Sequence, residues 1–312
     1  MIDDFIISIK KTLAYFDIFD YPLTASELEH FLWDGPIGGT HVDFQLALDR
    51  AITAGSVGRL NGFFFLPRRE KIVETRLNNV LLVEHKTRIA RRAIKMISRV
   101  PFVRAVFVCN TLAAGWPKKD SDIDLFIVAA HDKIWLVRMF VTLLMSITNL
   151  RRGRRKIADR VCLSFYVTEN SLNLSGVSLD PPDVYLIYWL LMLLPVYGGA
   201  EYYCRVLAEN SWTRDFVKNN RANYSLSSIL EVKLNKLEFF SHSAVEKIFS
   251  GRTGEALNGF CKKIQLKKIA GNHDYRRRAL GIGVVVNDEM LKFHENDRRA
   301  EYRERWREKI TN

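Results

Sequence analysis

The stretch Ala105–Val128 constrains the fold more tightly than any other part of the chain. Its first residues, Ala105–Val108, are apolar and typical of a short buried strand, and a turn and a polar loop follow them. In the next segment, Ser121–Val128, acidic or aromatic residues alternate with aliphatic ones. This period of two predicts a second strand and places the carboxylates of Asp122 and Asp124 on the same face.

Two neighbouring carboxylates repel each other unless a cation or a proton lies between them. Mg²⁺ prefers oxygen ligands, and it is usually bound by one or two protein carboxylates together with phosphate oxygens. Such an ion activates an attacking hydroxyl and neutralises the charge of a triphosphate during in-line displacement. Asp122 and Asp124 are therefore candidate ligands of Mg²⁺ or Mn²⁺ and candidate catalytic residues.

The turn upstream of this pair extends the pattern. It reads Asn110-Thr111-Leu112-Ala113-Ala114-Gly115, and ten residues separate Thr111 from Asp122. The turn, the spacing and SDIDL together resemble the signature of the nucleotidyltransferase superfamily typified by DNA polymerase beta. Compact bacterial members of that superfamily often read GSLARG followed by SDIDL. Here Asn110 replaces the glycine, and asparagine also tolerates a positive φ. Thr111 replaces the serine and keeps its hydroxyl.

The resemblance implies an α+β fold with a mixed sheet and flanking helices. It also implies an enzyme that transfers a nucleoside monophosphate from an NTP to a hydroxyl acceptor, which the resemblance does not specify. Asp122 and Asp124 would hold the metal and carry the catalysis. The nucleotide-binding residues would be Asn110, Thr111, Lys118 and Ser121.

The chain departs from the superfamily at the third carboxylate, which active members usually carry on a neighbouring downstream strand. The best candidate strand is Arg160–Thr168, and its interior has no acidic residue. Asp159 precedes this strand and Glu169 follows it, so either is a candidate to reach the metal. Two functions stay open: an active nucleotidyltransferase, and a catalytically impaired nucleotide- or nucleic-acid-binding regulator with the same fold.

Residues 1–72 are predicted to form a separate module of three helices and a hairpin. The first helix has apolar residues at helical spacing. Thr24 and Glu27 form a capping box at the start of the second, and the third spans roughly Val42–Ala54. Asn61-Gly62, between two short apolar runs, then predicts a hairpin turn.

Three helices followed by a two-stranded wing resemble a winged helix-turn-helix, in which the third helix reads duplex DNA. In this chain that helix carries Asp43, Asp49 and Arg50 as its charged residues. Affinity for DNA comes mostly from Lys and Arg on phosphates, so this is a poor phosphate-facing surface. We therefore favour a packing or protein-interaction role for the module over DNA binding.

The rest of the chain divides into a nucleotidyltransferase core, residues 73–175, and a basic, mainly helical C-terminal region, residues 176–312. The net charge of +12 suggests attraction to polyanions such as nucleotides, nucleic acid or anionic lipid. Basic residues are concentrated in Lys86–Arg104, which has no acidic residue, and in Phe260–Arg278. Helical periodicity runs through Leu226–Phe249. These basic surfaces are candidates for nucleic-acid contact.

Two apolar segments, Ile134–Leu150 and Val184–Tyr197, raise the question of a membrane span. Arg138 interrupts the first, and the second is shorter than the roughly 20 residues that a span needs. We interpret both as buried core helices. Membrane-surface association, helped by Arg151–Lys156, is the alternative. The cysteines are scattered and the N-terminus lacks a signal-peptide pattern, so a cytoplasmic protein is expected.

Overall fold

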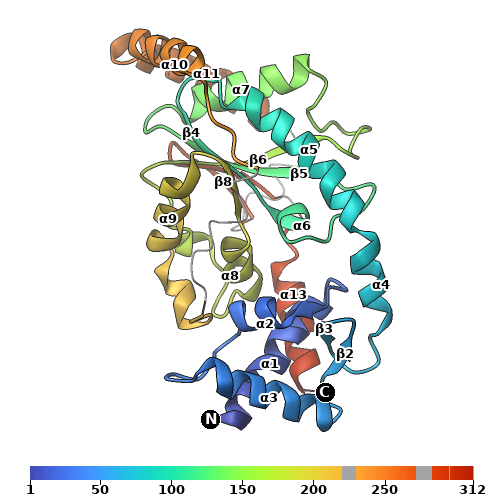
Figure 1. Ribbon diagram of the computed structural model, residues 1–312. Coiled ribbons are helices and arrows are strands. Elements are labelled where there is room, and N and C mark those ends of the chain that lie inside the picture. Colours follow the sequence, from blue (N-terminus) through green and yellow to red (C-terminus); the bar gives the residue numbers. More distant parts are fainter. Residues whose placement is uncertain (220–229, 272–282, 295, 312) are drawn as a thin grey trace.

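The computed structural model describes residues 1–219, 230–271, 283–294 and 296–311. Figure 1 shows a small sheet in the N-terminal part, at one end of the molecule, and a large sheet towards the other end. The large sheet is mixed, has six strands and is flanked by helices. The predicted α+β class is therefore confirmed.

The N-terminal unit combines three helices with a three-stranded antiparallel sheet of order β1-β3-β2. The capping box is confirmed, because Thr24 and Glu27 exchange hydrogen bonds between side chain and backbone. Asn61 and Gly62 have φ values of 51° and 80°, which confirms the hairpin turn. The strand β1 was not predicted. The elements are α1 (Ile2–Asp17), β1 (Leu23–Thr24), α2 (Ala25–His30), α3 (His41–Thr53), β2 (Gly58–Leu60) and β3 (Phe63–Phe65).

The central sheet has the order β7-β4-β5-β6-β9-β8. β5 and β6 are parallel, and every other neighbouring pair is antiparallel. Both strands predicted around the carboxylate pair are present at the centre of this sheet. The strands are β4 (Val103–Val108), β5 (Ile123–Ala129), β6 (Val161–Thr168), β7 (Leu194–Tyr197), β8 (Val284–Val286) and β9 (Met290–Phe293).

The two faces of β5 pack into two different cores, as its alternating sequence requires. Leu125 and its aliphatic neighbours at every second position pack with residues of α5 (Val80–Ile97) and α7 (Ile134–Ile147). Phe126, on the face of Asp124, packs against Phe165 of β6 and Trp189 of α8 (Val184–Leu191). The carboxylate pair therefore lies at the start of β5, on the side of the sheet that packs against α8.

The described part of the C-terminal region is largely helical, but it also supplies β7, β8 and β9 to the central sheet, which was not predicted. Of the segment Val184–Tyr197, interpreted as one core helix, only the part up to Leu191 is helical, and the chain continues as β7. The helix expected over Leu226–Phe249 begins at Lys236, with residues 226–229 outside the described ranges, as are 272–278 of the basic Phe260–Arg278 segment. The remaining elements are α4 (Lys71–Asn78), α6 (Asn110–Ala113), α9 (Gly199–Glu209), α10 (Lys236–Ile248), α11 (Arg252–Ala270), α13 (Arg299–Thr311) and two 3-10 turns, Ser175–Val177 and Ser211–Asp215.

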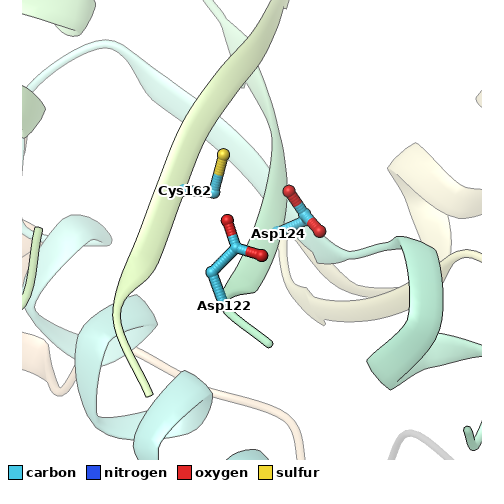
Figure 2. Close-up of side chains that lie close together, drawn as sticks. All are labelled: Asp122, Asp124 and Cys162. Carbon is cyan, nitrogen blue, oxygen red and sulfur yellow. The ribbon is translucent and has the colours of Figure 1, made fainter. Parts of the chain in front are cut away.

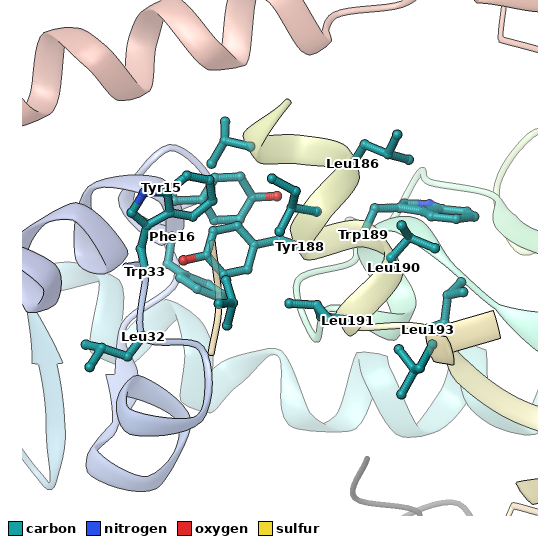
Figure 3. Close-up of a cluster of buried hydrophobic side chains, with 14 of the residues drawn as sticks. Tyr15, Phe16, Leu32, Trp33, Leu186, Tyr188, Trp189, Leu190, Leu191 and Leu193 are labelled. Atoms are coloured by element: carbon teal, nitrogen blue, oxygen red, sulfur yellow. The ribbon is translucent and has the colours of Figure 1, made fainter. Parts of the chain in front are cut away.

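Aromatic packing joins the N-terminal unit to the central part, as Figure 3 shows. Tyr15 of α1 stacks on Tyr188 of α8, with ring centroids 4.2 Å apart. Trp33 contacts both Tyr188 and Trp306 of α13. Because these side chains are buried, α8 and α13 hold the N-terminal unit against the rest of the chain.

Within the described ranges, no helix is long and apolar enough to cross a membrane. α8 is buried almost throughout, as predicted for a core helix. α7 differs, because one face packs on the sheet while Phe140, Leu143 and Ile147 remain exposed.

Candidate metal and nucleotide site

The carboxylates of Asp122 and Asp124 lie side by side at the start of β5, as Figure 2 shows. Cys162 of β6 is the register partner of Asp124 in the parallel β5–β6 pair. One ligand atom from each of these three side chains lies within 4.8 Å of the other two. In the described part of the chain, this is the one such cluster of His, Cys, Asp or Glu large enough to hold a metal ion.

The environment of Asp124 disfavours its ionised form. Burial, followed by the charge of Asp122, raises the pKa of Asp124 to about 6. Hydrogen bonds from Asn110 and Cys162 and the charge of Arg152 oppose this effect. A divalent cation would relieve the same repulsion without a proton.

Asn110 fits its position for two reasons. Its φ is +55°, in the left-handed region that asparagine tolerates better than most residues. Its side-chain oxygen accepts a hydrogen bond of 2.7 Å from Trp189 Nε1. This contact turns the amide NH₂ towards Asp124, so one residue links the α6 turn to the carboxylate pair.

Neither candidate for a third carboxylate joins the pair. Asp159 accepts a hydrogen bond of 2.8 Å from Lys86 and also contacts His85. Glu169, beyond the other end of β6, accepts a hydrogen bond from Tyr202. The side chain of β6 that faces the pair is the Cys162 thiol, and burial followed by the charge of Asp124 raises its pKa.

Arg152 supplies the nearest positive charge to the pair. Its Nη1 atom lies 2.8 Å from Asp122 Oδ2 and 3.7 Å from Cys162 Sγ. The contact with Asp122 is an ion pair whose geometry is not that of a hydrogen bond. The buried Oδ2 atom of Asp122 therefore has no hydrogen-bond donor among the described residues. Arg152 belongs to the basic segment after α7, which the sequence analysis connected with a membrane surface rather than with this site.

Lys86 fixes the loop that leads into β5. Its side chain is completely buried, and its Nζ donates to the carbonyl oxygen of Ser121 at 2.7 Å as well as to Asp159. The basic residue at this position therefore acts inside the fold, next to the carboxylate pair, and not on a solvated surface.

All four predicted nucleotide-binding residues line one cavity of about 450 Å³, which we call the α6 cavity. Three basic side chains lie on its wall, and they come from the loop before β5 and from the chain at and just before α13. Aromatic side chains of α8 and α13 form another part of the wall. The residues from these groups are Asn110, Thr111, Lys118 and Ser121, then Arg298 and Arg305, then Tyr185, Trp189 and Tyr302.

A smaller cavity of about 170 Å³, the β9 cavity, adjoins the α6 cavity, and the two share Asn110, Tyr185, Trp189, Arg298 and Tyr302 on their walls. Its own residues include Lys292 of β9, the strand next to β6, and His294, which follows that strand. Burial lowers the pKa of Lys292 to about 8 and that of His294 to about 4. Neither side chain was predicted to line this site: from the sequence, His294 was interpreted as a surface or packing residue.

The donor atoms at the pair suit a hard cation. Two carboxylates supply oxygen ligands of the kind that Mg²⁺ and Mn²⁺ prefer, and Asp122 Oδ2 is a buried acceptor without an aligned donor. The Cys162 thiol is a soft donor that does not suit these hard cations, and burial raises its pKa. The residues therefore fit a cation held by two carboxylates and by oxygens of a bound ligand.

Comparison with protein-family models, with curated proteins and with solved structures found no match for this chain.

Proposed function

We propose that the chain is a metal-dependent nucleotidyltransferase with a polymerase-beta-like core, which transfers a nucleoside monophosphate from an NTP to a hydroxyl acceptor. One observation carries the proposal. The carboxylate pair of β5 is hydrogen-bonded, through Asn110, to a turn whose Thr111 lines the α6 cavity together with basic side chains. This arrangement combines metal ligands with a pocket suited to a polyphosphate.

In this proposal the α6 cavity receives the NTP. Lys118, Arg298 and Arg305 attract the triphosphate, and Thr111 offers a hydroxyl to it. The rings of Tyr185 and Tyr302, stacked with centroids 5.3 Å apart, form an aromatic wall beside these charges. The size of the cavity falls within the range of about 300–1,000 Å³ that is usual for ligand sites.

Asp122 and Asp124 hold Mg²⁺ or Mn²⁺ in this proposal. When bound, the ion supplies charge neutralisation at the transferred phosphoryl group and lowers the pKa of the attacking hydroxyl. Asn110 orients Asp124 by its hydrogen bond, and Lys86 holds the loop before Asp122 in place. The β9 cavity adjoins the α6 cavity and gives a small acceptor a place to bind.

The test is calorimetric titration of each NTP with Mg²⁺ into the wild-type chain and into the Asp122→Asn/Asp124→Asn double variant. Asp132→Asn, an exposed carboxylate just beyond the other end of β5, is the matched control. We expect metal-dependent binding in the wild type and the control and none in the double variant. Absence of binding to a folded wild-type chain, or equal binding to the double variant, would contradict the proposal.

A second function, nucleotide binding without transfer, is favoured by a separate observation. Cys162 takes the place of a third carboxylate, and Arg152 already pairs with Asp122. A chain of this kind would bind an NTP but release no pyrophosphate in the presence of any acceptor. Incubation with an NTP labelled on the α-phosphate, followed by assay of labelled product and of pyrophosphate, separates the two functions.

For the N-terminal unit we favour a winged-helix-like module that packs or binds protein rather than DNA. On α3, Val42 and Leu46 are exposed, and Asp43 caps the helix start. An apolar and acidic surface of this kind would not attract phosphates. Duplex-DNA binding that is abolished by Arg50→Ala would contradict this assignment.

A further inference from the structure

Three helices at one end of the molecule leave large apolar side chains uncovered. α7, α10 and α11 lie together at the end opposite the N-terminal unit (Figure 1). A groove of about 670 Å³, lined almost entirely by apolar side chains, joins α7 to α10. Contiguous apolar surface is uncommon on monomeric soluble proteins and usually marks a binding face. The exposed side chains are Phe140, Leu143 and Ile147, then Leu237, Phe239, Phe240 and Ile248, then Phe260, Ile264 and Leu266.

The charges around this apolar surface are mainly basic. Both acidic residues of α10 are paired with arginines, Glu238 with Arg99 and Glu246 with Arg104. The described part of α11 contributes Glu255 as its acidic residue. In α10, α11 and the segment after α7, Arg152 and Lys262 pair with Asp122 and Asp288. The other basic residues there are Lys236, Lys247, Arg252, Lys263, Lys267, Lys268, Arg151, Arg154, Arg155 and Lys156.

We infer that this face, the α7–α10–α11 surface, binds the surface of an anionic lipid bilayer. Exposed Phe, Leu and Ile flanked by Lys and Arg are the composition of helices that lie in a membrane interface, where apolar side chains enter the acyl boundary. Each basic residue near an anionic leaflet adds to the attraction. The inference is independent of the proposed transferase, because it uses neither the carboxylate pair nor the two cavities beside it.

The same charges argue against two other occupants. A second copy of the chain would bring two basic faces together, and like charges oppose such contact. Single-stranded nucleic acid binds through positive charge and through stacking of its bases on aromatic side chains. Its bases do not stack on aliphatic residues such as Ile147, Ile248 and Ile264, because these side chains have no aromatic ring. A bilayer accommodates the aliphatic, aromatic and basic side chains at once.

The test is co-sedimentation of the full chain with vesicles of phosphatidylcholine alone and with vesicles that also contain phosphatidylglycerol. Ile147→Glu and Phe240→Glu alter the proposed face, where these side chains are 75% and 74% exposed. Leu81→Glu is the matched control, because Leu81 is also 75% exposed but lies near the start of α5, far from α10 in Figure 1. None of the three removes a buried side chain, so all should fold.

We expect the wild type and Leu81→Glu to bind phosphatidylglycerol vesicles at low salt and to release them as salt rises. Each of the other two variants should bind about tenfold less, because it removes an apolar side chain from the bilayer and adds a repelling charge. Three results would each overturn the inference. They are a wild type that stays in the supernatant, equal loss in Leu81→Glu, and a dimer that Ile147→Glu dissociates in the absence of vesicle binding.

Discussion

Replacing Asp124 with Asn is expected to stabilise the metal-free chain although it removes a metal ligand. Burial and the charge of Asp122 raise the pKa of Asp124 from 3.8 to about 6, so folding disfavours its ionised form. This difference in pKa corresponds to about 3 kcal/mol, at 1.36 kcal/mol per pH unit. Weaker hydrogen bonds to Asn110 and Cys162 offset about 1 kcal/mol of that gain. The variant should therefore be more stable than the wild type by about 2 kcal/mol near pH 8.

The raised pKa also fixes the direction of the pH dependence. A group whose pKa is higher in the folded chain contributes stability that is fully present below its unfolded pKa and is lost as pH rises through the folded value. For Asp124 this window runs from 3.8 to about 6. The advantage of Asp124→Asn over the wild type should therefore grow by about 1.4 kcal/mol between pH 5 and pH 8.

Urea unfolding followed by tryptophan fluorescence, in buffers with a metal chelator, measures this difference at each pH. Asp159→Asn is an informative control, because hydrogen bonds from Lys86 and His85 lower the pKa of Asp159 against the effect of its burial. That substitution should destabilise the chain, and its effect should shrink as pH falls through the lowered pKa. An Asp124→Asn chain that is no more stable than the wild type at pH 8 would refute the reasoning. So would an advantage that does not change with pH.

Three further substitutions test the rest of the site. Arg152→Ala removes a half-exposed ion pair with Asp122 worth about 0.2–1 kcal/mol, which the metal would otherwise have to displace. Mg²⁺-dependent nucleotide binding should therefore tighten by up to about fivefold in calorimetry. Weaker binding would mean that Arg152 contacts the ligand. Lys86→Met removes the buried ammonium that donates to the Ser121 carbonyl and to the Asp159 carboxylate, and it should cost about 1–3 kcal/mol in urea unfolding; unchanged stability would contradict this role. Cys162→Asp adds a third carboxylate beside Asp122 and should destabilise the metal-free chain. Mn²⁺ should then raise the melting temperature of this variant more than that of the wild type. An equal shift in melting temperature would show that position 162 does not face the metal.

Features that depend on neighbouring residues were predictable from the sequence. The alternation over Ser121–Val128 defines both the strand and the shared face of its carboxylates, because side chains on a strand repeat with a period of two. The positive φ of Asn110 and the hairpin at Asn61-Gly62 follow from residue types that tolerate the left-handed region. The capping box at Thr24 is equally local, because its partner is three residues away.

Features that depend on distant contacts were not predictable. β7 continues an apolar helix without a break in composition, and its Pro195 is tolerated because β7 is an edge strand that pairs with β4 alone. Cys162 faces Asp124 only because β5 and β6 pair in parallel with one register. Arg152 and Lys292 reach the site from segments whose sequences indicate only a basic loop and a short strand.

The strongest reason to place function at the carboxylate pair is that several locally unfavourable features coincide there. Asp122 and Asp124 repel each other, Asn110 has a left-handed backbone, and Lys86 and Cys162 are polar groups in buried positions. Each needs a specific partner to offset its cost, and most of the remaining buried positions of β4, β5 and β6 are apolar. Conflicts between local preference and global fold are expected at functional sites, where binding of a ligand offsets their cost. A cation and a polyphosphate together would satisfy the carboxylates of β5 and the basic wall of the α6 cavity, which no apolar ligand would do.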